Sequence, residues 1–148
     1  MLEGYLQWYR VVVVRKVEGL PRDLALRPIE PGILSALGIV KHLGWVERGW
    51  SRRAILGEEY PVPWNDADPD ADLRIEDDET VDSVVAFYRS EWEAADAIWS
   101  ARSLDDTGLD HGRTVSIRWI LVHMIEETAR HAGHLDLITE QLDGRTGD

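Results

Sequence analysis

The sequence contains no cysteine and only one phenylalanine among its 148 residues. The absence of cysteine excludes disulfide bonds, thiolate zinc fingers and a cysteine nucleophile. Any metal must therefore be bound through nitrogen and oxygen atoms. The chain has seven tryptophans, so we expect tryptophan to be the main aromatic residue of the core.

Long apolar runs are also missing. The longest, residues 11–14, is far too short to cross a bilayer. The N-terminal residues lack the charged and apolar regions of a signal peptide, so we expect a cytoplasmic protein with no membrane partner. Basic residues are few: 16 Lys and Arg against 28 Asp and Glu give a net charge of −12. This charge argues against a nucleic-acid partner.

Most of the negative charge lies in residues 58–82, where eleven acidic residues face a single Arg74. We interpret this stretch as a solvated acidic loop. Aspartates alternate at positions 66 to 72 as in a calcium loop, but the glycine and closing glutamate of that loop are not at the required spacing. Residues 58–79 are predicted to be the most irregular or mobile interior segment. Within it, residues 60–64 are expected to form either a lid or a local surface cluster.

Apolar residues recur every three to four positions in four segments, which predicts helices over 2–18, 35–56, 80–103 and 116–142. Residues 104–115 are predicted to be a polar connector, and no segment has a credible strand pattern. The length fits one domain over 1–148. We therefore predict an all-α four-helix bundle with long connectors, in which crossovers are permitted.

Three of the five histidines lie in the last predicted helix. Glu127 and His131 are one turn apart on one face, with His123 and His134 along the same flank. His42 lies at the edge of the apolar stripe of the second helix. Two imidazoles and a carboxylate match the ligands of open catalytic zinc sites. The alternative is that each histidine is a structural residue on a helix flank.

We favour a metal site. His42, Glu127 and His131 are predicted to bind one divalent ion at the end of the bundle where the second and last helices meet. Zinc is the expected ion, and nickel or manganese would accept the same ligands. Other chemistries lack their motifs: the HExxH of zinc proteases, the paired Glu-x-x-His of ferritin-like proteins, the GxSxG elbow and a glycine-rich phosphate loop.

Two groups of motifs resemble a known family. Residues 26–28, 38–43 and 46–48, together with 123–127 and 129–134, are similar to the DinB/YfiT-like superfamily, in particular its DUF664 branch, which is related to mycothiol-dependent maleylpyruvate isomerases. The resemblance covers nearly the whole chain. It implies a four-helix bundle whose divalent metal is held by a histidine of the second helix and an i, i+4 pair of the last helix. It also implies frequent homodimers and thiol-dependent transferase or isomerase chemistry.

Mapped onto this chain, the metal ligands implied by the resemblance are His42, Glu127 and His131. Many members have histidine where this chain has Glu127, whereas the isomerases have glutamate. Many members also have glutamine at the position of His134, so we place His134 beside the ligands or facing the substrate. His134 and His123 are the candidate catalytic residues.

A bound dication stabilises the thiolate form of a thiol, which is the nucleophilic form. Because the chain has no cysteine, the thiol must come from a small molecule such as mycothiol or bacillithiol. Fourteen of the sixteen basic residues are arginine, a bias that favours an actinobacterial source and hence mycothiol. The leading hypothesis is a metal-dependent thiol S-transferase or isomerase acting on a small electrophile. The alternatives are a metal-dependent hydrolase with a water nucleophile and a non-catalytic metal- or ligand-binding bundle with a stress-response role.

Overall fold

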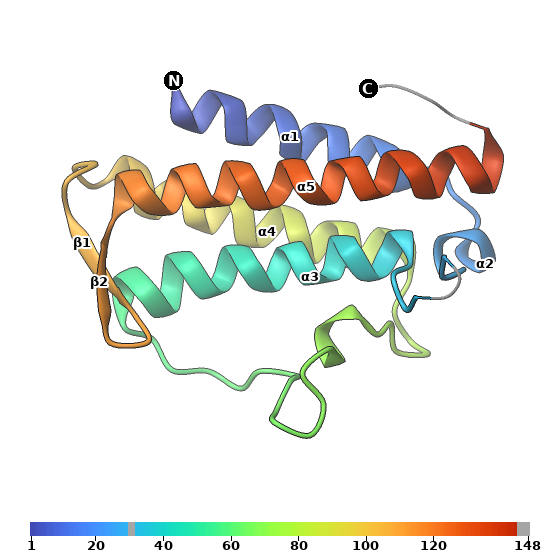
Figure 1. The fold of residues 1–148 in the computed structure, drawn as a ribbon, viewed down its shortest axis with the longest axis horizontal. Coiled ribbons are helices and arrows are strands. Elements are labelled where there is room, and N and C mark those ends of the chain that lie inside the picture. The colour runs from blue at the N-terminus through green and yellow to red at the C-terminus, as the bar shows by residue number, and fades with distance from the viewer. Residues whose placement is uncertain (30–31, 145–148) are drawn as a thin grey trace.

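The computed structural model describes residues 1–29 and 32–144. Its long helices are α1 (Leu2–Val17), α3 (Ala36–Arg48), α4 (Val81–Ser100) and α5 (Ile117–Asp143), which lie side by side as a bundle (Figure 1). The predicted all-α four-helix fold is therefore confirmed. Among the described residues, none of the helices combines the length and apolar character needed to cross a bilayer.

The helix ends follow from local hydrogen bonding. The side chains of Ser35 and Ser116 each accept a hydrogen bond from a backbone N–H in the first turn of α3 and α5. Thr80 and Ser83 form a reciprocal capping box at the start of α4. Gly144 ends α5 in the left-handed conformation, with a φ of 77°. These caps place the helix boundaries within a few residues of the predicted ones.

The second predicted helix, 35–56, is continuous but changes its winding. After α3 the chain enters a π-helix, η1 (Gly49–Ile55), in which each hydrogen-bonded turn is wider than in an α-helix. Gly57 follows with a φ of 69°, a conformation that glycine adopts without strain. The wider turn is a local feature that hydrophobic periodicity does not reveal.

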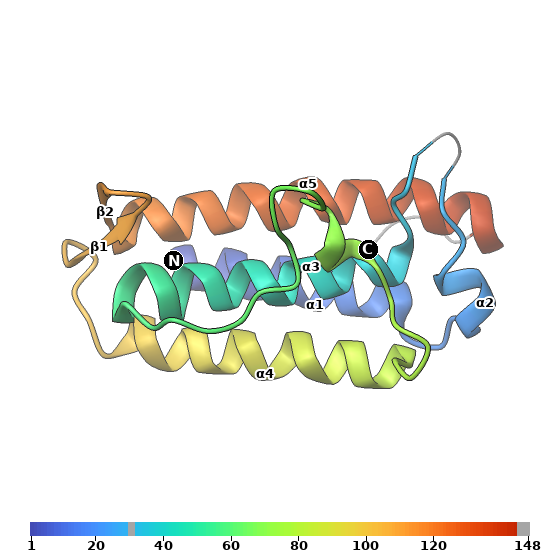
Figure 2. The same ribbon diagram turned by 90° about the horizontal axis from the view of Figure 1, so that it is seen from below.

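Two pairs of parallel helices make up the bundle. α3 and α4 run in the same direction, and so do α1 and α5, antiparallel to the first pair (Figures 1 and 2). Parallel neighbours cannot be joined by a tight turn. The chain therefore returns along the bundle through residues 57–80, which we call the crossover segment. This segment is irregular apart from the short 3-10 helix η2 (Ala71–Leu73), as the composition predicted.

The segment 104–115 was expected to be a connector without strands, and this expectation is wrong. Strands β1 (Thr107–Asp110) and β2 (Arg113–Ser116) form an antiparallel hairpin. Both residues of its two-residue turn, His111 and Gly112, have positive φ, at 47° and 82°. Turns of this kind match the twist of a hairpin. Each strand is only four residues long, too short for an alternating pattern to stand out in the sequence.

Apolar side chains from all four long helices fill the interior, but a buried ion pair crosses it as well. Arg10 of α1 and Glu47 of α3 are both 0% exposed. Arg10 Nε donates to Glu47 Oε1 at 2.6 Å, and its Nη1 donates to Asp96 of α4 at 2.7 Å. The pair thus links three helices, and each charge is satisfied where water is excluded. A short helix, α2 (Arg22–Ala25), lies in the connector between α1 and α3.

Candidate metal centre and adjoining cavity

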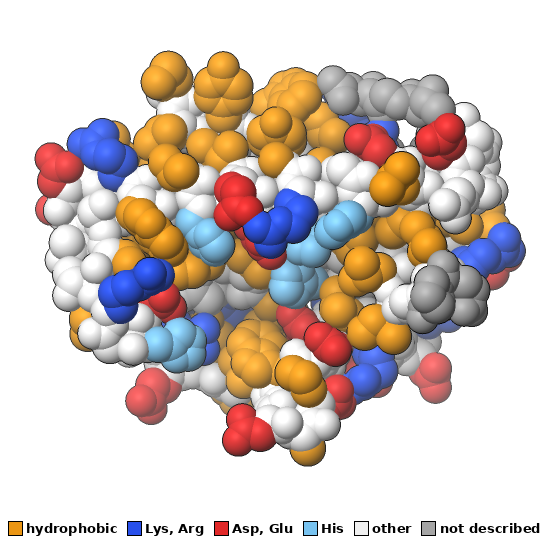
Figure 3. Space-filling view, viewed as in Figure 1, with side chains coloured by type: hydrophobic (Ala, Val, Ile, Leu, Met, Phe, Trp, Pro, Cys, Tyr) orange, Lys and Arg blue, Asp and Glu red, His pale blue; other side chains and the backbone are white. Residues whose placement is uncertain are grey.

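The structure brings His42, Glu127 and His131 together. One ligand atom from each residue can be chosen so that all three lie within 4.8 Å of one another. His42 occupies the centre of α3, and His131 lies near the midpoint of α5. The cluster therefore lies halfway along the bundle and not at its end, which corrects the predicted location. In Figure 3, histidine side chains gather near the middle of this face.

One oxygen of Glu127 faces both imidazoles. Glu127 Oε1 lies 3.1 Å from His131 Nε2 and 3.5 Å from His42 Nε2. The other oxygen, Oε2, accepts a hydrogen bond from Arg130 Nη1 at 2.9 Å. Arg130 also pairs with Glu126, so its guanidinium is fixed on the outside of α5. Arg130 thereby holds the carboxylate with Oε1 turned inward.

A fourth residue, Asp72, completes the cluster from the crossover segment. His42 Nδ1–H donates a hydrogen bond to Asp72 Oδ2 at 2.7 Å, and Asp72 is 7% exposed. This bond leaves His42 Nε2 facing Glu127. Asp72 could not be singled out from the sequence, because it is one of eleven acidic residues in a stretch interpreted as solvated. The number of residues between His42 and Asp72 matches no metal-site motif.

The crossover segment is anchored where it carries Asp72. A Cβ atom at Gly38 would overlap the carbonyl oxygen of Leu73, so only glycine allows this approach. Lys41 Nζ donates to the carbonyl oxygen of Arg74 and to Glu79 Oε2, both at 2.7 Å. Part of the acidic stretch is therefore packed onto α3, in contrast to the solvated loop that we expected.

The electrostatics of the cluster favour positive charge. Burial alone would lower the pKa of His42, but its hydrogen bonds with Asp72 and Glu127 outweigh that effect and raise the pKa to about 9. The hydrogen bonds of Glu127 with His131 and His42 hold the pKa of its carboxyl well below the ordinary value. The carboxylates of this cluster remain ionised and stabilise a proton on an imidazole. The same negative charges would stabilise a bound metal cation.

The two other histidines of α5 differ in position. His134 Nδ1 lies 3.4 Å from His131 Nδ1, so one ring can donate a hydrogen bond to the other when only one of these two atoms carries a proton. Burial, together with the positive charges of His131 and Arg130, lowers the pKa of His134 and favours its neutral form. His123 instead stacks on Trp119, at 5.3 Å between ring centroids, and meets Trp50 edge-on at 5.0 Å. His123 is not part of the three-ligand cluster.

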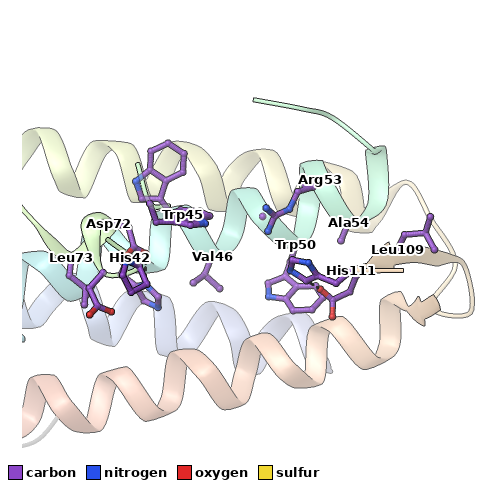
Figure 4. A pocket seen from close by; sticks show the side chains of 15 residues that line it. His42, Trp45, Val46, Trp50, Arg53, Ala54, Asp72, Leu73, Leu109 and His111 are labelled. Atoms are coloured by element: carbon purple, nitrogen blue, oxygen red, sulfur yellow. Dashed lines mark hydrogen bonds and ion pairs between the residues drawn. The ribbon is translucent and has the colours of Figure 1, made fainter. Parts of the chain in front are cut away.

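A cavity of about 430 Å³ adjoins the cluster on the His42 side. This volume suits a small organic molecule. One face of α3 and η1 forms its floor, and the crossover segment and the β-hairpin form its walls (Figure 4). The lining includes three tryptophans, Trp45, Trp50 and Trp64, together with Arg53 and His111. This cavity could not be predicted from the sequence, because its lining comes from three separate parts of the chain.

Among known protein families, the family model described as mycothiol-S-transferase matches residues 1–144, nearly the whole chain. This family belongs to the DinB/YfiT-like superfamily, as the motifs of the two halves suggested. No curated protein and no solved structure matches the chain.

Proposed function

Because the chain belongs to the mycothiol-S-transferase family, we propose that it transfers the sulfur of mycothiol to a small electrophile at a divalent metal held by His42, Glu127 and His131. The family match supports a thiol-dependent transferase role in general. The proposal that the reaction depends on a metal is supported mainly by the three ligand atoms, which lie within 4.8 Å of one another. Zinc is the proposed ion, since it accepts two imidazoles and a carboxylate while leaving a position open.

The chemistry of the cluster fits such an ion. With the Nδ1 proton of His42 donated to Asp72, its Nε2 offers a lone pair. When His131 likewise presents the lone pair of Nε2, the cluster consists only of electron-pair donors around Glu127 Oε1. Such a group is unfavourable unless a proton or a cation bridges it. One carboxylate and two neutral imidazoles leave a bound dication with a net positive charge, which attracts a thiolate.

The bound metal would supply stabilisation of the thiolate form of the thiol cosubstrate. The protein's own residues orient the ligands around it. Asp72 fixes the tautomer of His42. When His131 Nε2 is a ligand, its proton resides on Nδ1, and it donates to His134 Nδ1, 3.4 Å away. His134 is therefore proposed to position His131, and its neutral form suits that role.

His123 was a candidate catalytic residue, and its contacts suggest a different role. It packs against Trp50, which lines the cavity, and against Trp119 on the outer face of α5. We propose that His123 supports the Trp50 wall of the cavity. The homodimer implied by the family resemblance stays a prediction, and sedimentation velocity of the purified protein tests it.

The test combines metal analysis with turnover. The purified protein is expected to contain about one divalent ion per chain, and to consume alkylating electrophiles only when mycothiol is present. Elemental analysis by mass spectrometry identifies the ion, and chromatography of the thioether product measures transfer. Turnover without thiol would instead indicate a hydrolase. Metal binding with no turnover on any electrophile would indicate a binding protein.

A further inference from the structure

The residues that line the cavity on α3 and η1 follow one helix face. His42, Val46, Trp50 and Arg53 recur every three to four positions, so the cavity runs lengthwise along the helix. Figure 4 shows His42 toward one end and Leu109 toward the other, with Arg53 and Trp50 between them. The proposed metal ligand and the arginine thus lie apart along one cavity.

Arg53 differs from the other arginines of this helix. Arg48 and Arg52 both contact the buried carboxylate of Glu91, at 2.6 and 3.3 Å. Within the described part of the chain, the Arg53 guanidinium has no hydrogen bond or ion pair. In a protein with a net charge of −12, a cation on a cavity wall that no acidic side chain neutralises is available to a ligand.

The local backbone directs Arg53 into the cavity. Its Nη2 atom lies 3.7 Å from the position of a Cβ at Gly49, so the side chain folds back along η1 toward the His42 end. Figure 4 shows the same direction, with Arg53 extended toward Trp45. The π-helical winding of residues 49–55 places Trp50 and Arg53 along the same wall, and π-turns are frequent at functional sites.

Three acidic residues line the cavity, and within the described residues none of them forms an ion pair with this guanidinium. Asp110 at the hairpin end pairs with Arg113 at 3.1 Å, Asp72 is held by His42, and Asp70 lies near Asp72 in the crossover segment. Arg53 therefore offers a cation that an anionic ligand in the cavity can pair with. A ligand with one anionic end would be oriented by this guanidinium.

From these features we infer that the cavity binds an electrophile with an aromatic body and a carboxylate at the end remote from its reacting carbon. Arg53 pairs with the carboxylate, Trp50 contacts the aromatic body, and the reacting carbon points toward His42. Gly49, beside which the Arg53 guanidinium lies, is seven positions after His42, which corresponds to roughly 10 Å of helix. That length accommodates one aromatic ring plus the sulfur. The inference rests on the proposed function for the identity of the nucleophile.

Two matched probes test it: 4-(bromomethyl)benzoate and the neutral 4-(bromomethyl)benzamide. In each reaction the mycothiol sulfur, having released its proton to solvent, forms a bond to the benzylic carbon, and bromide leaves with the bonding electron pair. We expect wild-type protein to have a higher kcat/KM for the benzoate. Arg53→Gln should lower kcat/KM for the benzoate about 10- to 100-fold, the range for loss of a charged hydrogen-bonded pair. The value for the benzamide should stay within about twofold.

Arg15→Gln is the matched control, because Arg15 is exposed on α1 and does not line the cavity. It removes the same charge and should leave both reactions unchanged. Equal rates for the two probes in wild-type protein, or an equal loss for both in Arg53→Gln, would overturn the inference while leaving the transferase function intact.

A binding measurement separates this inference from the proposed function. The unreactive 4-methylbenzoate and 4-methylbenzamide can be titrated into ¹⁵N-labelled protein while the indole N–H signals are followed by NMR. The inference requires that the benzoate binds more tightly, and that Arg53→Gln removes the preference. If the preference is found but no probe reacts with mycothiol, the cavity assignment stands and the transferase proposal fails. If the two ligands bind equally, the cavity assignment fails.

Discussion

Asp72 Oδ2 accepts a hydrogen bond from His42 Nδ1 at 2.7 Å and so joins the crossover segment to the centre of α3. Carboxylates that hold a metal-binding imidazole in this way commonly contribute 10- to 100-fold to metal affinity. We predict that Asp72→Ala lowers the affinity for zinc by about this factor. Competition with a chromophoric chelator measures it. Asp70→Asn, which removes a neighbouring charge without touching His42, should leave the affinity near the wild-type value.

A second prediction concerns the order of the α5 histidines. His131→Ala removes a proposed ligand and should abolish stoichiometric zinc binding. His134→Ala removes only the partner of His131 Nδ1 and should weaken binding by about 10- to 100-fold. Zinc content after dialysis against a weak chelator distinguishes the two. The reverse order would exchange the roles of the residues, and full occupancy in both variants would rule out the site.

A third prediction concerns the glycine beneath the crossover segment. In Gly38→Ala the new methyl group overlaps the carbonyl oxygen of Leu73, so the segment must move away from α3. We expect a loss of about 1–3 kcal/mol in the free energy of unfolding, as for other overpacked positions. Urea denaturation followed by tryptophan fluorescence measures the change. Gly133→Ala is the control, because no atom lies within 4 Å of its added Cβ, and it should be neutral or stabilising.

The buried ion pair supplies a fourth prediction. Glu47→Ala leaves the Arg10 guanidinium at 0% exposure with only Asp96 as a charged partner. Breaking a buried pair from one side costs about 3–5 kcal/mol, and urea denaturation should show a loss in this range. The exposed pair of Arg89 and Glu18 is a suitable comparison. Glu18→Ala should cost less than about 1 kcal/mol. Similar losses for the two variants would contradict the prediction.

The sequence was most informative where the determining interactions are local. Helical periodicity located the four long helices, and the structure shows that α3, α4 and α5 begin at the capping residues Ser35, Thr80 and Ser116. The four-residue spacing of Glu127 and His131 likewise predicted that they share a face. His42 was proposed as their partner from its place at the edge of an apolar stripe, and the family resemblance pointed to the same residue. The structure was needed to show the approach itself, since which helices become neighbours depends on the whole chain.

Features that arise from contacts between distant segments could not be predicted. Asp72 is one acid among many until the crossover segment is laid over Gly38. The hairpin depends on Gly108, where a Cβ would overlap the carbonyl oxygen of Ala54 in η1. Arg53 has no sequence feature that separates it from Arg48 and Arg52. What separates it is that Glu91 contacts the other two.

The parallel arrangement of α3 and α4 has a further consequence for how this protein can change over evolution. Since parallel helices require a long return, the crossover segment would be needed even if it served no ligand. The crossover segment passes over His42 and contributes residues to the cavity wall. Most of these residues do not pack in the core between the helices. Substitutions in the crossover segment can alter which molecules the cavity accepts while the buried faces of the helices stay the same. Part of ligand selection is thus encoded outside the packed helix faces, and that part can diverge while helix packing is kept.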